Sequence, residues 1–182
     1  MEPLLVILDL DETLVYATEA ELDRAPDFRA VDYAVYKRPH LDEFLAGVFE
    51  IGRVAVWTSS GRGYAAEVIE QLFGSPSRLE FFWCAERCTY RFDHETRGRY
   101  TVKKLHKVRR RGYDLARVVV VDDTPEKHIL NYGNLIAVDS FEGRATDAEL
   151  PHLLRYIRAL EREPNVRAVE KRTWRLRRGD VG

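Results

Sequence analysis

The chain begins with an apolar run that ends abruptly in carboxylates, and this boundary constrains the fold more than any other feature. Residues 4–8 read Leu-Leu-Val-Ile-Leu, and Asp9 and Asp11 follow directly. Such a run is typical of a strand buried on both faces inside a parallel sheet. Side chains two apart on a strand point to the same side, and ligands of open α/β sheets bind at the carboxyl ends of the strands. We therefore expect both acids in an active site, although an isolated Asp-x-Asp-x-Thr sequence is more often a solvated turn.

The rest of the chain alternates predicted strands with predicted helices. Residues 16–38 lack a helical period, and we expect a small insert there, such as a β-hairpin, over the strand ends. Strands alternating with helices imply right-handed crossovers and a Rossmann-like, doubly wound parallel sheet of about five strands. Further strands are expected at residues 54–59, 80–85, 118–121 and 135–138, and helices at residues 39–50, 64–73, 102–111, 125–132 and 147–163.

Length and composition fit one globular domain. The chain has 182 residues, of which 45% are hydrophobic and 32% charged, and its net charge is −1. We assign residues 1–165 to the domain and residues 166–182 to a basic C-terminal tail. Such a charge gives no overall pull toward nucleic acid or membrane, and no apolar run is long enough to span a bilayer. Met1 leads almost directly into the first strand, so we expect no signal peptide and an intracellular location.

Polar groups suited to binding phosphate follow three of the predicted strands. Four carboxylates converging at one sheet edge would raise one another's pKa values unless a cation were bound. Oxygen ligands without His or Cys favour Mg²⁺ over zinc. The groups are Asp9, Asp11 and Thr13 after the first strand, Thr58 and Ser59 after the second, and Asp122 and Asp123 after the fourth, with Lys103 in the segment before it.

These groups are the parts needed for phosphoryl transfer to an aspartate. Asp9 would be the nucleophile, and Asp11 would protonate the leaving alcohol and later activate water. Thr58 and Lys103 would hold the phosphoryl oxygens as charge builds up.

The same order of motifs resembles the haloacid dehalogenase superfamily, and within it the FCP/SCP-type phosphatases, which act on phosphoserine in the RNA polymerase II C-terminal tail and related phosphoproteins. The resemblance covers about residues 4–160. It implies a fold without a large cap domain, and an open site that suits a phosphorylated protein or peptide. The motifs are residues 9–15 (DLDETLV), 37–45 (KRPHLDEFL), 57–60 (WTSS), 64–65 (YA), 102–105 (VKKL) and 121–125 (VDDTP).

The resemblance also implies individual roles. Asp11 matches the acid/base and a backbone metal ligand, and the family places a metal ligand at Asp123, with Asp122 close by. Lys103 matches the phosphate lysine, with Lys104 as the alternative register. Thr13 and Tyr64 are candidate substrate contacts. The metal set is therefore Asp9, Asp11, Asp122 and Asp123.

Two departures from the family bear on the substrate. The insert before Lys37 is shorter than in the polymerase-tail enzymes, where it forms a pocket for a substrate proline, and the loop at residues 93–98 is longer. We therefore expect the chemistry to carry over, but not the polymerase-tail specificity. Alternatives are the same chemistry on a small molecule or a nucleic-acid end, and a phosphoprotein-binding scaffold without turnover.

Basic residues gather at residues 103–111 and 167–178. They could attract nucleic acid or an acidic phosphoprotein. A solvated helix face and a frayed tail are the more common meaning of such runs, so nucleic acid is not favoured. Trp174 in the tail either packs back on the body or anchors a partner.

Overall fold

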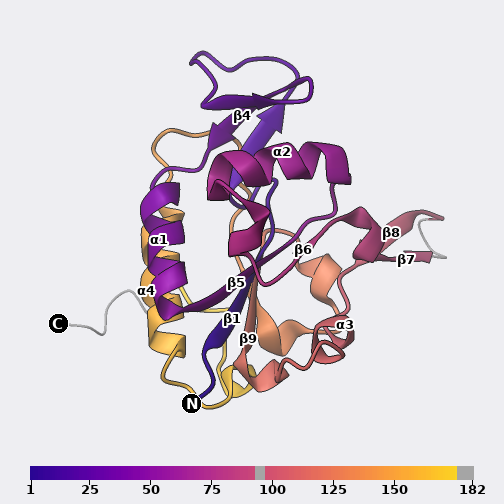
Figure 1. Cartoon of the computed structure of the whole chain (residues 1–182), viewed down its shortest axis with the longest axis vertical. Helices are drawn as coiled ribbons and strands as arrows, with labels where there is room; N and C mark the ends of the chain where they lie inside the picture. The colour runs from indigo at the N-terminus through magenta and orange to yellow at the C-terminus, as the bar shows by residue number, and fades with distance from the viewer. Residues whose placement is uncertain (93–96, 176–182) are drawn as a thin grey trace.

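The computed structural model describes residues 1–92 and 97–175, and a parallel five-stranded sheet forms its centre (Figure 1). The strand order is β10-β9-β1-β5-β6. Leu8 at the end of β1 lies opposite Val56 of β5 and Val121 of β9, so the three central strands end together. This confirms the predicted fold class. The strands are β1 (Leu4–Leu8), β5 (Gly52–Trp57), β6 (Phe82–Trp83), β9 (Val118–Asp122) and β10 (Leu135–Ala137).

The alternating sides of β1 face two separate cores. Leu4, Val6 and Leu8 pack in the core that includes residues of α1 (Leu41–Ile51), α2 (Arg62–Phe73) and α4 (Glu149–Leu160). Leu5 and Ile7 pack on the other face, with Trp57, Trp83 and residues of α3 (His106–Arg109). Burial of both faces explains why β1 is a continuous apolar run and not an alternating one.

The insert folds as a small antiparallel sheet of three strands, and not as one hairpin. It consists of β2 (Val15–Thr18), β3 (Phe28–Ala30) and β4 (Tyr33–Lys37), in the order β2-β4-β3. Figure 1 shows it at the top of the molecule, beyond the end of the central sheet. Among the described residues no larger cap covers the strand ends.

The predicted helix at residues 102–111 is wrong in its first half. Residues up to Val102 belong to β8 (Arg99–Val102), which pairs with β7 (Thr89–Phe92) in a separate hairpin. Only α3 is helical, so Lys103 lies in the connection between β8 and α3. Residues 93–96 of the loop singled out for its length lie outside the described residues. The short 3-10 helices are η1 (Pro76–Arg78), η2 (Ala85–Arg87), η3 (Leu115–Arg117), η4 (Pro125–His128), η5 (Tyr132–Asn134) and η6 (Val166–Ala168).

Residues 166–175 are packed on the body of the protein, where a frayed tail was expected. Trp174 is only 3% exposed, lies against Tyr156 and donates its indole N–H to the Ala137 carbonyl at 2.8 Å. Lys171 is also buried, and its ammonium donates to the carbonyls of Gly133 and Val169. The boundary at residue 165 stays a prediction, and the basic residues beyond 175 lie outside the described residues. None of the helices in the described part of the chain combines the length and apolar character needed to cross a membrane.

A buried arginine ties the insert to α4. Arg38 follows β4 directly, and its guanidinium is paired with both carboxylate oxygens of Asp147 at 2.9 Å. It also donates to the carbonyl of Thr13 at 3.0 Å. Asp147 in turn accepts the N–H of Glu149, at the first turn of α4. The base of the insert, the loop after β1 and the start of α4 are thus held at one point.

Replacing Trp174 should test how much the C-terminal segment stabilises the domain. Trp174→Ala removes a large buried ring and its hydrogen bond, and should lower the free energy of unfolding by about 3–5 kcal/mol. Trp174→Phe keeps most of the packing and should cost clearly less. Urea unfolding followed by circular dichroism measures both. Equal, near-zero losses would show that residues 166–175 do not pack on the body in solution.

The Arg38–Asp147 pair should make stability depend on pH. Although burial alone would raise it, the hydrogen bonds from Arg38 hold the pKa of Asp147 below its usual value. The stabilisation is therefore complete above the ordinary Asp pKa of about 3.9, and is lost as the pH falls through the lowered value. Asp147→Asn should cost about 3 kcal/mol near neutral pH, because Arg38 loses its charged partner. The difference between the two proteins should shrink in urea unfolding at about pH 3; a constant difference would contradict the assignment.

Candidate active site

The loop after β1 is a tight turn built around one carbonyl. The Asp9 N–H donates to the Val121 carbonyl at 3.0 Å, which fixes Asp9 at the joined ends of β1 and β9. The Leu10 carbonyl then accepts the N–H groups of Leu14 and Val15. Glu12 lies within this turn and has a φ of 60°. This left-handed conformation costs free energy in a residue other than glycine. The turn reverses the chain at once and places Asp9 and Asp11 in different surroundings.

Asp9 is buried beside a buried lysine. Its carboxylate is 2% exposed, and the Lys103 ammonium lies 2.9 Å from Oδ1. Burial and the neighbouring Asp122 raise the pKa of Asp9 to about 6, against the opposing effect of Lys103. Burial alone would lower the pKa of Lys103, but the Asp122 and Asp9 carboxylates raise it above its usual value. Lys103 is therefore charged, and the structure places it at the site, with Lys104 outside this cluster.

Asp122 holds Lys103 in place. Its Oδ2 accepts from the Lys103 ammonium at 2.5 Å and lies 2.9 Å from His128 Nε2, and its Oδ1 accepts the N–H of Thr124 at 2.9 Å. Although burial opposes it, Lys103 and then His128 keep the pKa of Asp122 well below its usual range. A carboxylate so fully engaged is better suited to positioning Lys103 than to binding a metal.

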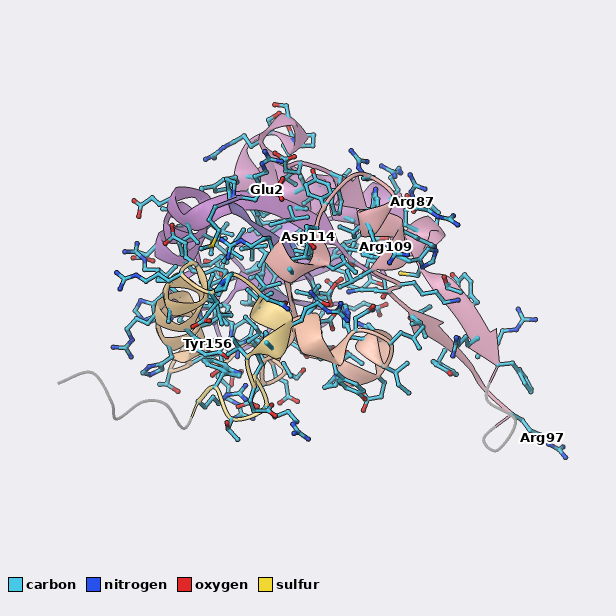
Figure 2. The ribbon with its side chains drawn as sticks, turned by 90° about the horizontal axis from the view of Figure 1, so that it is seen from below. Glu2, Arg87, Arg97, Arg109, Asp114 and Tyr156 are labelled. Atoms are coloured by element: carbon cyan, nitrogen blue, oxygen red, sulfur yellow. The ribbon has the colours of Figure 1, made fainter. Side chains whose placement is uncertain are left out.

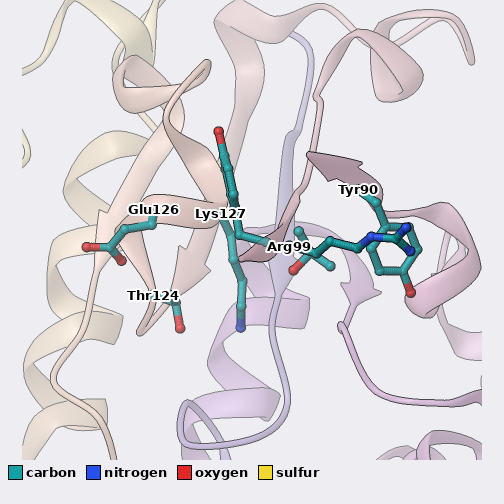
Figure 3. A pocket seen from close by; sticks show the side chains of 7 residues that line it. Tyr90, Arg99, Thr124, Glu126 and Lys127 are labelled. Carbon is teal, nitrogen blue, oxygen red and sulfur yellow. The ribbon is translucent and has the colours of Figure 1, made fainter. Parts of the chain in front are cut away.

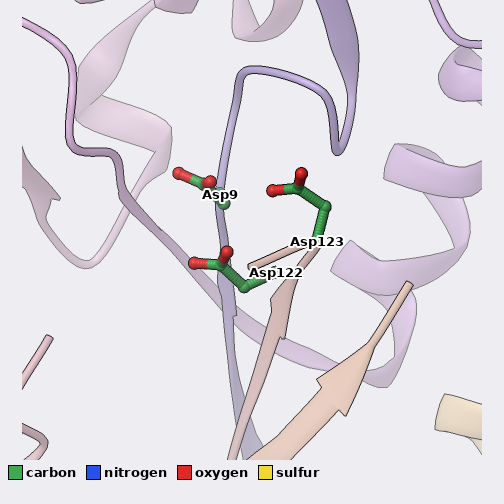
Figure 4. Close-up of side chains that lie close together, drawn as sticks. All are labelled: Asp9, Asp122 and Asp123. Atoms are coloured by element: carbon green, nitrogen blue, oxygen red, sulfur yellow. The ribbon is translucent and has the colours of Figure 1, made fainter. Parts of the chain in front are cut away.

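Three carboxylates meet at the ends of β1 and β9, as Figure 4 shows. Asp9, Asp122 and Asp123 each offer an oxygen within 4.8 Å of the others. Asp9 Oδ1 is buried, and among the described residues its one close polar neighbour is the Lys103 ammonium at 2.9 Å, so it retains lone-pair capacity. Ionised, the three groups carry more negative charge than the two nearby lysines neutralise. An all-oxygen set with residual negative charge fits Mg²⁺, to which Asp9 and Asp123 are the better placed ligands.

The Asp11 side chain lies outside this cluster, contrary to the expectation that four carboxylates converge. Its Oδ2 accepts from the Ser60 hydroxyl at 2.5 Å and its Oδ1 from the Tyr64 hydroxyl at 2.6 Å. Burial and the Asp11 charge raise the pKa of Tyr64, so it remains a donor. Tyr33 of the insert lies edge-on to Tyr64 at 5.7 Å. Asp11 and these side chains line a cavity of about 300 Å³ between the insert and α2.

The three predicted hydroxyl residues, Thr58, Ser59 and Thr13, differ in their surroundings. Thr58 is buried at the end of β5, and its hydroxyl accepts the N–H of Ser60 at 3.0 Å. The Ser59 hydroxyl lies 3.8 Å from the Cys88 thiol. Thr13, expected as a substrate contact, is fully buried and instead accepts the N–H of Asp123 at 3.2 Å. Thr13 therefore braces the loop that carries Asp123.

Sequence reasoning missed a second lysine at the site. The Lys127 ammonium lies 3.6 Å from Asp9 Oδ2 and 3.9 Å from Asp122 Oδ1. His128 and Ser60, the partners of Asp122 and Asp11, were missed as well. Lys127 and His128 lie in η4, directly after the Asp-Asp-Thr-Pro motif, and that closeness to a strand end was the available signal. Their direction depends on the tight turn of η4, which the sequence did not reveal.

A buried aspartate at the end of the central strand, backed by a lysine and two further aspartates, places the chain in the haloacid dehalogenase superfamily of phosphatase folds. A family model described as NLI interacting factor-like phosphatase matches residues 4–167. The chain therefore belongs to the NLI interacting factor-like phosphatase family.

Individual proteins agree with this assignment. The human carboxy-terminal domain RNA polymerase II polypeptide A small phosphatase 1 is 33% identical over 173 residues, which are 90% of this chain and 62% of that protein. The human CTD small phosphatase-like protein is 32% identical over 169 residues, covering 88% and 57%. The chain thus spans about six tenths of the length of these relatives. The fold is similar to that of the fission yeast RNA polymerase II CTD phosphatase Fcp1 bound to beryllium fluoride, with a TM-score of 0.60, 21% identity and coverage of 87% and 51%.

Metal binding at the aspartate cluster can be tested without any activity. Mg²⁺ that binds only the folded protein should raise the free energy of unfolding by about 2.7 kcal/mol at a hundred times its Kd. Asp123→Asn should abolish most of this gain, because it removes one charged ligand. Asp42→Asn, an exposed aspartate on α1, is the matched control and should keep the gain. Equal stabilisation of all three proteins in urea unfolding would contradict the site.

Proposed function

We propose that this protein is a Mg²⁺-dependent phosphomonoesterase that forms an aspartyl-phosphate on Asp9 and acts on phosphoserine or phosphothreonine in proteins. The observation that carries the proposal is the buried Asp9 carboxylate beside the Lys103 ammonium, at the end of the central strand. A buried anion prepared for attack on an anionic substrate requires fixed positive charge around it. Lys103 and Lys127 supply part of that charge on this chain.

In the first step an oxygen of Asp9 attacks phosphorus, and the bond from phosphorus to the substrate's alcohol oxygen breaks. Lys103 holds the carboxylate and faces the phosphoryl oxygens, where a fixed cation stabilises the transition state. A bound Mg²⁺ would offset the repulsion between the carboxylate and the phosphoryl group. Thr58 would donate its hydroxyl to a phosphoryl oxygen, as its place directly after β5 allows.

In its protonated form Asp11 would give its proton to the departing alkoxide, and as a carboxylate it would later take one from the water that hydrolyses the aspartyl-phosphate. Phosphate then leaves and both carboxylates return to their starting states. The separate environment of Asp11 supports this division of labour. Ser60 and Tyr64 hold its carboxylate in one orientation, away from the lysines that serve Asp9.

The open surroundings of the site favour a large substrate. The three-stranded insert does not close over Asp9 as a cap domain would, and the cavity beside Asp11 is walled by Tyr33 and Tyr64. A phosphorylated side chain on a protein could enter there with its backbone outside. The names of the relatives point to a polymerase-tail substrate for those proteins, but the shorter insert here does not carry that specificity over.

Asp9→Asn and Asp11→Asn should separate the two roles. Asp9→Asn removes the attacking charge, so hydrolysis of an aryl phosphate should fall to background. Asp11→Asn removes the proton donor and should slow turnover of phosphoserine peptides by about 10²- to 10⁴-fold. Phosphorylation of Asp9 by an aryl phosphate should suffer less, because phenoxide leaves without much protonation.

Single-turnover kinetics on both substrates measure these effects, with Asp42→Asn as the control that should behave like the unaltered protein. Substantial activity in Asp9→Asn, or equal slowing for the two leaving groups in Asp11→Asn, would show that the roles are misassigned. A phosphate-binding protein without turnover in any condition would be a scaffold, and a metabolite that outperforms every phosphopeptide would replace the proposed substrate class.

A further inference from the structure

A second cavity lies beside the nucleophile, on the side of the β7–β8 hairpin. We call it the hairpin pocket. It measures about 400 Å³ and is lined by Tyr90 and residues 99–101 of the hairpin and by Thr124, Glu126 and Lys127 of the segment after β9 (Figure 3). The mechanism above uses none of these groups except Lys127.

Lys127 connects the hairpin pocket to the reacting centre. Its side chain lines the pocket, and its ammonium lies 3.6 Å from Asp9 Oδ2. A substrate with its phosphoryl group at Asp9 would therefore meet the pocket within the length of one lysine side chain. At about 3.3 Å per residue, an extended peptide covers that distance in about two or three residues.

The backbone fixes the pocket relative to Asp9. The Lys103 N–H, directly after β8, donates to the Lys127 carbonyl at 2.8 Å. The Asn131 side-chain amide donates to the Lys103 carbonyl at 2.6 Å. The base of the hairpin and the segment after β9 are thus joined through the same lysine that contacts Asp9. The described part of the pocket is therefore tied to the backbone of the site.

The walls of the pocket are aromatic and cationic. Tyr90 is 64% and Tyr100 36% exposed. Arg99 is exposed, and within the described part of the chain no carboxylate forms an ion pair with it. Figure 3 shows Arg99 reaching toward Tyr90, with the Glu126 carboxylate turned away from it. Arg99 and Tyr90 share one face of the hairpin, and an exposed arginine beside a tyrosine ring is suited to a planar or tetrahedral anion.

The segment around the pocket is positively charged, like Arg99 and Lys127 in its lining. Residues 86–111 contain ten lysines and arginines against three acidic residues, although the whole chain has a net charge of −1. Lys103 is buried and paired with Asp9 and Asp122, but the other nine basic residues still outnumber the three acidic ones. Figure 2 shows Arg87, Arg109 and Arg97 on the side from which the hairpin projects. Such a field favours an acidic partner and raises its rate of association.

We propose that the hairpin pocket is a specificity subsite that selects phosphopeptides with an acidic group, a carboxylate or a second phosphoryl group, within about three residues of the phosphorylated residue. This rests on the proposed phosphatase function and names its substrate class more closely. Arg99 would bind the acidic group, and Tyr90, on the same face of the hairpin, would flank the peptide. Lys127 would bridge this group and the phosphoryl group at Asp9.

The test compares phosphoserine peptides that differ only at the second and third positions on either side, which carry glutamate, phosphoserine, glutamine or lysine. The kcat/KM for the glutamate or phosphoserine peptides should exceed that for the glutamine peptide by about tenfold or more, as for a charge-assisted hydrogen bond. The glutamate and phosphoserine arms show which anion is preferred. Lysine peptides should be the poorest substrates.

Variants then assign the preference to the pocket. Arg99→Gln should remove most of the advantage of the acidic peptides, and Arg99→Glu should favour the lysine peptides. Neither should change hydrolysis of a small aryl phosphate, which does not reach the pocket. Arg158→Gln, an exposed arginine on α4, is the matched control for loss of one positive charge and should keep the preference.

The outcomes distinguish the two proposals. No turnover of any phosphate ester by the unaltered protein would overturn the phosphatase function itself. Turnover of aryl phosphate and all peptides without a preference for acidic neighbours would overturn only the subsite, as would a preference that survives in Arg99→Glu. Faster turnover of a terminally phosphorylated oligonucleotide, lost in Arg99→Gln, would assign the pocket to nucleic acid and also overturn the proposal.

Discussion

The site depends on one buried positive charge, the Lys103 ammonium between Asp9 and Asp122. Transferring a lysine ammonium from water to the protein interior costs several kcal/mol, and ion pairs with nearby carboxylates are needed to offset this cost. The dependence is mutual, because Asp9 and Asp122 are buried as well and would repel each other without the lysine. The arrangement joins three separate parts of the chain: the end of β1, the end of β9 and the connection after β8. The same charge balance therefore stabilises the fold and fixes the carboxylate that we propose as the nucleophile.

The positions of most residues at the strand ends could be predicted from the sequence, because the signal lies within each strand and the residues that follow it. An apolar strand that ends in carboxylates marks both a buried sheet and the edge where ligands bind, so Asp9, Thr58, Asp122 and Asp123 followed from the strands alone. The predictions failed where the structure of a segment depends on contacts with residues far away in the sequence. The direction of Asp11 could not be read from strand alternation, since β1 ends at Leu8 and the following turn reverses the chain. The helix predicted at residues 102–111 began too early, because Val102 pairs with Thr89 of β7 as the last residue of a strand.

Two cavities lie near Asp9, the proposed nucleophile, and they are lined by chemically different residues. The one beside Asp11 is walled by the insert and α2, and its tyrosines accompany the proposed acid and base. The hairpin pocket is bordered by basic residues and lies on the lysine side of Asp9. A site open on both sides can bind the middle of a chain, whereas a capped site accepts only a small molecule. Under the proposed function, the insert and the hairpin would together determine which substrates reach Asp9.

Arg38 constrains how chains of this kind can diverge. A buried guanidinium that loses its carboxylate leaves an uncompensated charge, so positions 38 and 147, which are 109 residues apart, must be inherited as a pair. The strands between Val15 and Lys37 carry no such obligation to α4. New turns can enter the insert without disturbing the pair. The sequence of the three-stranded insert can thus change while its attachment to the rest of the domain stays the same.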